Sequence, residues 1–264
     1  MTATDTIFAG SIPRQYDRNL GPLFFEPYAK LAAARAKSFA PRRILETAAG
    51  TGIVTTELNR ALPNAEIVAT DLNQAMLDIA AEKIRPDKVR FLEADALDLP
   101  FVDGEFDLVL CQFGVMFFPD KVKGNAEARR VLRGGGHYLL IIWDEIEKNP
   151  VSRLVDDAVA SVFPENPPRF LERAPYSYSN PAQIERDVRG AGFDDVQLER
   201  VGASSRIDAH MAAYGICCGS PMTAEIAERG EGAVERAAAA AERALAALDG
   251  KDVPMSAWFV TATK

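Results

Sequence analysis

The chain has few of the residues that most often carry reactive chemistry. Its 264 residues include only two histidines, His137 and His210, and three cysteines. Two of these cysteines, Cys217 and Cys218, are adjacent in the sequence, so the thiols do not form a disulfide framework. No group of cysteines and histidines has the spacing of zinc ligands. We therefore expect no metal site and a reducing compartment.

Long apolar runs and an excess of basic charge are also missing. No run approaches the ~20 apolar residues that are needed to cross a bilayer. Residues 1–10 lack the charged-then-apolar order of a signal peptide. The formal net charge is −8, which repels phosphate backbones, so nucleic acid is not an expected partner. These absences favour a cytoplasmic globular protein without a membrane span.

Short apolar runs alternate with amphipathic stretches between Arg43 and Trp143. Strands are predicted over 43–47, 66–70, 89–93, 106–111 and 138–143, and helices over 51–62, 73–84 and 121–132. The triple glycine 134–136 is expected to stop the last of these helices. Strands separated by helices favour parallel pairing with right-handed crossovers and helices on both faces. The expected fold class is therefore α/β and doubly wound.

The two ends of the chain have a looser pattern. Helices are predicted over 22–39, 150–163 and 181–191, late strands over 197–201 and 258–262, and helical segments between those strands over 207–217 and 222–248. The last segment contains the alanine tract Ala237–Ala241, which we interpret as a surface helix because charged residues flank it. No internal repeat or domain break is evident, so we expect a single domain over residues 1–264.

A glycine loop, ILETAAGTG over 44–52, follows a predicted strand and opens a predicted helix. This is the setting of a nucleotide-binding loop, in which glycines allow a tight turn and the helix offers free N–H groups. Thr55 stands where a dinucleotide-binding loop has its third glycine. Glu46 would repel a pyrophosphate but favour an ammonium group. Taken alone, the loop is also compatible with a plain strand-to-helix turn.

Acidic residues follow the next two predicted strands. Asp71 lies 19 residues beyond Gly52 and is placed to accept hydrogen bonds from both ribose hydroxyls of an adenosine. It is also compatible with a capping acid for the helix that starts near Asn73. Asp95 is placed to accept from an adenine amino group, and Ala96 is small enough for the ring to lie against the backbone. In strand order, the acids predict an adenosine-containing ligand.

Five segments stand in a fixed order between residues 41 and 143: ILETAAGTG, VATDLNQAML, FLEADALDLPF, FDLVLCQFGVMFFPD and RRVLRGGGHYLL. In this combination the chain resembles the class I S-adenosylmethionine-dependent methyltransferases, especially the small-molecule branch similar to ubiquinone and menaquinone biosynthesis enzymes. The segment GSIPRQYDRNLGPLFFEPYA resembles the lid of one subgroup. The resemblance implies a Rossmann-like, mostly parallel seven-stranded sheet. An N-terminal lid helix (1–40), a donor-binding core (41–145) and a C-terminal part (146–264) with helical cap insertions and the last two strands would share one domain.

The resemblance also implies a ligand and its site. S-adenosyl-L-methionine would donate a methyl group to a small-molecule acceptor and become S-adenosyl-L-homocysteine. Ala48 departs from the glycine of many family members, and its methyl is expected to be tolerated if φ is negative at this position. The residues that the resemblance places at the donor are Tyr16 as a lid over the cation, Glu46, Ala48, Gly50 and Gly52 around the methionine portion, Asp71 at the ribose, Leu72 and Met76 beside the adenine, Asp95 and Ala96 at its edge, and Gln112 near the amino group or the sulfonium.

The acceptor side is predicted more coarsely. Aromatic residues follow the fourth predicted strand at the mouth where open α/β sheets bind ligands, and we expect core packing for two of the three: Phe113, Phe117 and Phe118. The segment 150–179, which contains Tyr176 and Tyr178, is expected to cap the pocket and to shape the choice of acceptor.

No residue is predicted to be catalytic. Methyl transfer from a sulfonium displaces an already activated group, so the protein mainly aligns the acceptor and excludes water, and a general base is optional. His137 is expected at the end of the sheet opposite the site, and His210 away from the acceptor pocket. Three alternatives stay open: a nicotinamide-dependent oxidoreductase, an aminopropyltransferase and a non-catalytic donor-binding protein.

Overall fold

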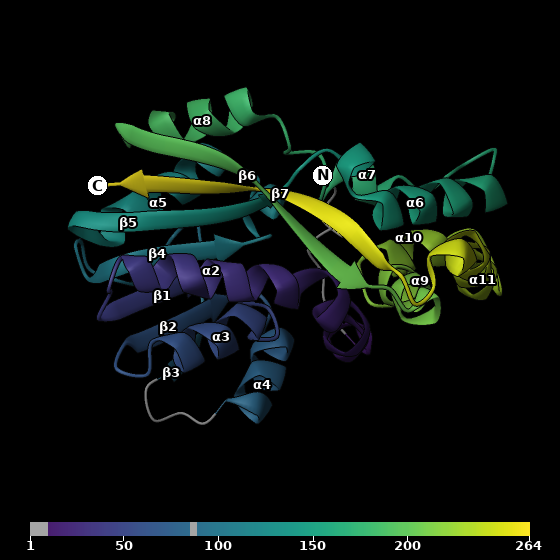
Figure 1. Ribbon diagram of the computed structural model, residues 1–264, viewed down its shortest axis with the longest axis horizontal. Helices are drawn as coiled ribbons and strands as arrows, with labels where there is room; N and C mark the ends of the chain where they lie inside the picture. Colours follow the sequence, from purple (N-terminus) through teal and green to yellow (C-terminus); the bar gives the residue numbers. More distant parts are fainter. Residues whose placement is uncertain (1–9, 85–88) are drawn as a thin grey trace.

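A seven-stranded sheet with the order β3-β2-β1-β4-β5-β7-β6 runs through the computed structural model, which describes residues 10–84 and 89–264 (Figure 1). The expectation about a leader peptide concerns residues that, apart from Gly10, lie outside this range. The strands are β1 (Arg43–Thr47), β2 (Glu66–Asp71), β3 (Val89–Glu93), β4 (Phe106–Gln112), β5 (Leu132–Trp143), β6 (Asp195–Arg206) and β7 (Asp252–Thr263).

The first five strands pair in parallel, and β7 lies antiparallel between β5 and β6. From β1 the chain adds β2 and β3 on one side and then returns to add β4 and β5 on the other. Doubly wound sheets bind ligands at the carboxyl ends of the strands where the order reverses, because the connecting loops diverge there. The predicted α/β class with a mostly parallel seven-stranded sheet is confirmed.

Helices cover both faces of the sheet (Figure 1). In that view α2 (Glu26–Ser38) and α3 (Ile53–Ala61) lie in front of the sheet, and α5 (Lys121–Val131) lies behind it. Helix α8 (Pro181–Gly190) packs against α5, and α4 (Gln74–Lys83) packs against β2 and β3. These helices bury the strands from both sides, as a parallel sheet requires.

A second group of helices lies beyond the carboxyl ends of the parallel strands (Figure 1). We call this group the cap. It consists of α6 (Pro150–Val162), α7 (Phe170–Arg173), α9 (Ala209–Cys218), α10 (Met222–Ala227) and α11 (Ala233–Leu245), with the short segments η4 (Ile146–Lys148) and η5 (Ala246–Leu248). None of the helices in the described part of the chain combines the length and the apolar character that a bilayer crossing requires.

The N-terminal helix begins earlier than predicted. It starts as α1 (Ile12–Gln15), widens into the π-helical segment η2 (Tyr16–Phe25) and continues as α2. Pro22, which was expected to open the helix, lies inside η2. A wide π turn relieves the clash between a proline ring and the carbonyl four residues earlier, so the helix passes through it.

The predicted stop at the triple glycine is wrong in detail. Helix α5 ends at Val131, and β5 begins at Leu132 and runs through the glycines. A Cβ at Gly136 would lie 3.0 Å from the carbonyl oxygen of Arg133 and 3.1 Å from that of Asp107. The glycine therefore permits a close backbone approach within the β4–β5 pair, a use of glycine that a sequence pattern does not distinguish from a helix stop.

The predicted helix over 222–248 is two helices, α10 and α11. Gly230 and Gly232 separate them with left-handed φ values of +105° and +68°. The alanine tract is not simply a surface feature, because one of its faces is buried where α11 packs against α6 and α9. Small side chains let helices pack closely. The buried members of the tract are Ala237, Ala238 and Ala241.

A leucine in place of Ala238 is expected to destabilise the protein by about 1–3 kcal/mol, because Ala238 is completely buried and the added carbons must push α11 away from its neighbours. Ala240→Leu, at a partly exposed position of the same tract, is the matched control and is expected to cost clearly less. Chemical denaturation measures both. Equal losses for the two variants would contradict the burial of one face.

Candidate ligand-binding site

A cavity of about 360 Å³ lies between the carboxyl ends of the parallel strands and the cap. We call it the main cavity; its walls come from η2, the loops after β1 to β4, the end of β5, and α6, α7 and α9. A side cavity of about 30 Å³ shares part of its lining with the main cavity and is also lined by residues of the glycine loop. Tyr16, Phe25 and Gln112 line both. Cavities of several hundred Å³ are typical of small-molecule sites.

Most of the predicted site residues line the main cavity. They are Tyr16, Ala48, Gly50, Asp71, Leu72, Met76, Asp95, Ala96 and Gln112. Glu46 lines only the side cavity, and Gly52 lines neither cavity.

Gly52 has a structural position behind the loop. Its φ is +76°, and a Cβ there would lie 2.8 Å from the Cβ of Ala80 on α4. A side chain at Gly52 would therefore force the glycine loop away from α4. This residue shapes the site through its packing on α4, and its predicted contact with the methionine portion of a ligand stays a prediction.

Asp71, the last residue of β2, anchors the glycine loop. Its Oδ2 accepts a hydrogen bond from the N–H of Gly50 at 2.8 Å, and its Oδ1 accepts one from the N–H of Asn73 at 2.9 Å. The side chain is buried, and burial raises its pKa, although these hydrogen bonds act in the opposite direction. Within the described ranges no lysine or arginine forms an ion pair with it. The carboxylate is thus available to a ligand that donates hydrogen bonds.

The end of β3 lies beside the end of β2. The N–H of Ala94 donates to the carbonyl oxygen of Asp71 at 3.0 Å, and the Asp95 carboxylate accepts from the N–H of Leu97 at 2.8 Å. Leu72, next to Asp71, is 57% exposed. An exposed leucine at the mouth of a cavity offers an apolar surface to a flat ligand.

Glu46 is buried near the end of β1, beside the side cavity. Thr55 donates a 2.6 Å hydrogen bond from Oγ1 to Oε2 of Glu46. Burial raises the pKa of Glu46 to about 8, and the negative charge of Asp71 adds to this rise. Thr55 occupies the position of the third glycine in a dinucleotide-binding loop, and here its hydroxyl holds the carboxyl group of Glu46 by a hydrogen bond.

Two buried polar atoms beside the side cavity have no hydrogen-bond partner within the described part of the chain. They are Oγ1 of Thr51 and Oε1 of Gln112, whose Nε2 donates to the carbonyl oxygen of Phe25 at 3.3 Å. Buried polar groups are nearly always paired, so their partners are expected on a ligand. Thr51 was missed as a site residue, although its place at the end of the glycine loop was a usable signal.

The backbone is strained at the cavity wall. Ala48 has a φ of +52°, so the condition of a negative φ, under which its methyl was expected to be tolerated, is not met; Phe113 has a φ of +54°. Left-handed conformations cost roughly 1–2 kcal/mol for residues with a Cβ and concentrate at functional sites. A Cβ at Gly114 would lie 2.4 Å from that of Ala48, so this glycine makes room for the alanine methyl.

Aromatic rings form the apolar side of the main cavity. Phe113 stacks on Trp143 with ring centroids 3.8 Å apart, and Phe25 stacks on Tyr16 at 4.8 Å. The predicted aromatics 113, 117 and 118 all line the cavity, including the two that are also buried. Further apolar lining residues, not named from the sequence, come from five separate segments: Leu20, Phe24, Phe25, Met116, Trp143, Phe170, Leu171, Ile216 and Pro221.

The charged side chains that line the main cavity, among the described residues, are Asp71 and Asp95. His137 stacks on Phe39 at 4.2 Å and His210 lies 3.2 Å from Glu242; neither histidine lines a cavity. In the described ranges no group of three or more histidine, cysteine, aspartate or glutamate residues could hold a metal ion. The cavity therefore has a negative end and a neutral remainder.

The pKa of Glu46 predicts a pH-dependent stability. A folded-state pKa of about 8, above the ordinary value of 4.5, means that folding favours the protonated acid. Its contribution is complete below pH 4.5 and is lost as the pH rises to about 8, by at most about 1.4 kcal/mol per pH unit. Glu46→Gln removes this dependence. Denaturation across this pH range should show the variant gaining on the wild type as the pH rises; a constant difference would contradict the assignment.

The chain is similar in sequence to known methyltransferases, and the match includes the glycine loop. Residues 44–136 match the profile of a family described as "Methyltransferase domain". The chain is 34% identical over 209 residues to a demethylmenaquinone methyltransferase of Deinococcus radiodurans, with 72% of this chain and 85% of that relative covered.

Two solved structures share the fold at low sequence identity. One is an S-adenosylmethionine-dependent methyltransferase from Thermotoga maritima, with a TM-score of 0.57, 18% identity and 95% of both chains covered. The other is phosphoethanolamine N-methyltransferase 2 from Haemonchus contortus in complex with phosphomonomethylethanolamine and S-adenosylhomocysteine. Its TM-score is 0.59 and its identity 19%, with 96% of this chain and 56% of that chain covered.

Proposed function

This chain belongs to the class I S-adenosylmethionine-dependent methyltransferases, and from that premise we propose that its acceptor is a neutral ring compound with a large apolar surface. The reaction is the transfer of a methyl group from S-adenosylmethionine to a small molecule, with S-adenosylhomocysteine as the second product. The geometry of the site bears on two further points: where the donor lies and what kind of acceptor fits.

We assign the methionine end of the donor to the side cavity. Oε1 of Gln112 is an unused acceptor for the donor's ammonium group, and the Thr51 hydroxyl is an unused donor for its carboxylate. Glu46 lies on the same cavity, and a nearby ammonium would favour ionisation of its buried carboxyl. These unpartnered atoms support a zwitterionic amino-acid group at this place.

The adenosine end belongs to the acidic rim of the main cavity in this proposal. Asp71 accepts from the ribose hydroxyls, and Asp95 and Ala96 meet the edge of the adenine. Leu72 and Met76 supply the apolar surfaces beside the ring.

The loop and the lid complete the donor site. Ala48 and Gly50 present backbone to the donor, while Gly52 acts through its packing on α4. Tyr16 covers the site from η2 and is stacked on Phe25. An aromatic face near a sulfonium is a favourable contact for that cation.

The chemistry asks little of the protein beyond alignment. The donor supplies a methyl group that is already activated on sulfur. The lining residues hold the acceptor in line with it and exclude water, and an acceptor of sufficient nucleophilicity needs no base. In the described lining of the main cavity, the titratable side chains are Tyr16, Asp71, Asp95 and Tyr176.

The charge of the cavity lining supports a neutral acceptor. The two charged residues of the described lining are both committed to the donor, and the remaining wall is aromatic and aliphatic. A phosphorylated acceptor, such as the one bound in the Haemonchus contortus enzyme, would need basic partners, and no lysine or arginine is among these lining residues. A quinone-type ring, as the name of the Deinococcus radiodurans relative indicates for that protein, fits an apolar wall.

We assign one role to each of three parts of the chain. Residues 1–40 supply the lid, 41–145 the donor-binding core, and 146–264 the acceptor-shaping cap with the last two strands. A cap built from segments after β5 lies on the acceptor side of the main cavity, whereas the loops after β1, β2 and β3 line the donor side.

Asp71→Asn is expected to weaken the binding of S-adenosylhomocysteine by about 10- to 100-fold, because hydrogen bonds to a charged acceptor contribute roughly 1.5–3 kcal/mol. Calorimetry measures the Kd. Asp78→Asn, at an exposed position on α4 that pairs with Gln74, is the matched control and should bind like the wild type. Unchanged affinity in a folded Asp71→Asn protein would refute the ribose assignment.

The acceptor class is tested with donor labelled on its methyl group. Product formation is compared for 1,4-dihydroxynaphthalene, phosphoethanolamine and histamine, with mass spectrometry of each product. We expect transfer to the neutral ring and none to the two charged amines. Transfer to a charged amine alone would overturn the proposal. Donor binding without transfer to any compound, including a metabolite extract, would favour the non-catalytic alternative.

A further inference from the structure

We propose that the hydroxyl groups of Ser152 and Tyr176 form a paired site that binds an oxygen substituent of the acceptor and so orients its ring. This inference rests on the proposed function. Both residues line the main cavity, and Ser152 Oγ lies 2.7 Å from the hydroxyl oxygen of Tyr176. They are buried, at 4% and 7% exposure. Polar side chains are rare in this otherwise apolar wall. A bound ring with an oxygen substituent would therefore place that oxygen at the hydroxyl pair.

The Ser152–Tyr176 pair has one hydroxyl hydrogen more than its own hydrogen bond uses. Each hydroxyl carries one hydrogen, and the contact between the two oxygens uses only one of them. Whichever residue donates, the other keeps a hydrogen for which no acceptor is found in the described part of the chain. Buried donors are nearly always paired. The free hydrogen therefore suits a carbonyl or hydroxyl oxygen on a molecule in the cavity.

The protonation state of Tyr176 agrees with a donor. Burial raises the pKa of its phenol above the ordinary value, and the hydrogen bond with Ser152 offsets this only in part. The phenol thus remains protonated at neutral pH and acts as a hydrogen-bond donor, not as a base. Trp143 lies beside it with ring centroids 5.9 Å apart, so an acceptor ring next to the pair would also contact the indole.

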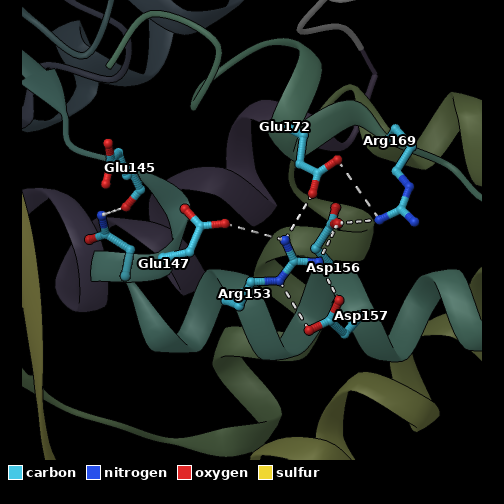
Figure 2. Close-up of polar contacts among 8 residues, drawn as sticks. Glu145, Glu147, Arg153, Asp156, Asp157, Arg169 and Glu172 are labelled. Carbon is cyan, nitrogen blue, oxygen red and sulfur yellow. Dashed lines mark hydrogen bonds and ion pairs between the residues drawn. The ribbon is translucent and has the colours of Figure 1, made fainter. Parts of the chain in front are cut away.

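The two residues are held by a network of ion pairs outside the cavity. Ser152 is on α6, and the side chain of its neighbour Arg153 points toward Asp157 and Glu172 (Figure 2). Nη1 of Arg153 lies 2.8 Å from Oε1 of Glu172 on α7, the helix that precedes Tyr176. This bond joins the helix that carries Ser152 to the helix just before Tyr176.

Asp156 strengthens the same junction. It is completely buried, and its Oδ2 lies 3.4 Å from Arg153 and 3.0 Å from Arg169, at the start of α7 (Figure 2). Removing the partner of a buried carboxylate is costly, and the pair between Asp156 and Arg169 joins α6 to the start of α7. A hydroxyl pair can select one orientation of a bound ring only when the segments that carry the two hydroxyls are held in place.

Tyr176→Phe and Ser152→Ala test the pair. In either variant we expect the KM for 1,4-dihydroxynaphthalene to rise about 10-fold or more, since a site that binds an oxygen by hydrogen bonds loses affinity when a partner is removed. The Kd for S-adenosylhomocysteine should stay unchanged, because the donor assignments involve other residues. A purely structural role would alter donor and acceptor binding together.

Tyr178→Phe is the matched control. It also removes a buried tyrosine hydroxyl with a hydrogen bond, here to Asp187 at 2.9 Å, but Tyr178 does not line the main cavity. The Tyr178→Phe variant should be less stable than the wild type but have the same KM for the acceptor. Ser161→Ala, at an exposed position near the end of α6, controls for the serine in the same way.

A binding measurement separates this inference from the proposed function. Calorimetry of 1,4-dihydroxynaphthalene with protein saturated in S-adenosylhomocysteine needs no turnover. Tighter binding by the wild type than by Tyr176→Phe and Ser152→Ala supports the pair even if transfer fails. Equal Kd values in wild type and variants, or no binding by the wild type, overturn it. If one variant does not fold, the other decides.

Discussion

The hydrogen bond from the Gly50 N–H to the Asp71 carboxylate is the contact on which the site depends. It joins the loop after β1 to the end of β2, next to the bond from the Ala49 N–H to the carbonyl oxygen of Thr70 at 2.9 Å. The carbonyl of Asp71 in turn receives the N–H of Ala94 after β3. Three loops are thereby tied to one another at the same edge of the sheet, and the carboxylate that ties them also faces the cavity.

Two buried acids at this edge give the site its charge preference. Glu46 and Asp71 both have raised pKa values because burial disfavours their charged forms, and the described residues supply no basic side chain to either. A cationic ligand relieves that penalty, whereas a pyrophosphate would worsen it. S-adenosylmethionine carries two positive groups, a sulfonium and an ammonium. The neutral, aromatic remainder of the cavity leaves the acceptor to be chosen by shape and by a few hydrogen bonds.

Sequence patterns predicted the five parallel strands and the residues after them well because their determinants are local. Buried parallel strands are continuous apolar runs, and the residues just after them converge by topology, so Asp71 and Asp95 could be placed on one rim from order alone. The cap side of the cavity depends on tertiary packing. Trp143 and Tyr176 come from segments with no shared motif, and the buried face of α11 is made of alanines, which suit a surface helix equally well. The positive φ of Ala48 depends on space that Gly114 leaves, which no local pattern records.

A crystal structure with S-adenosylhomocysteine decides whether Asp71 binds the donor. We expect the ribose hydroxyls within hydrogen-bond distance of Asp71, with the ligand's amino group beside Gln112 and Glu46. An apolar space should remain between the ligand's sulfur and the Ser152–Tyr176 pair. A ligand bound with its ribose away from Asp71, or with its amino-acid end among the cap helices, would rule out this donor site.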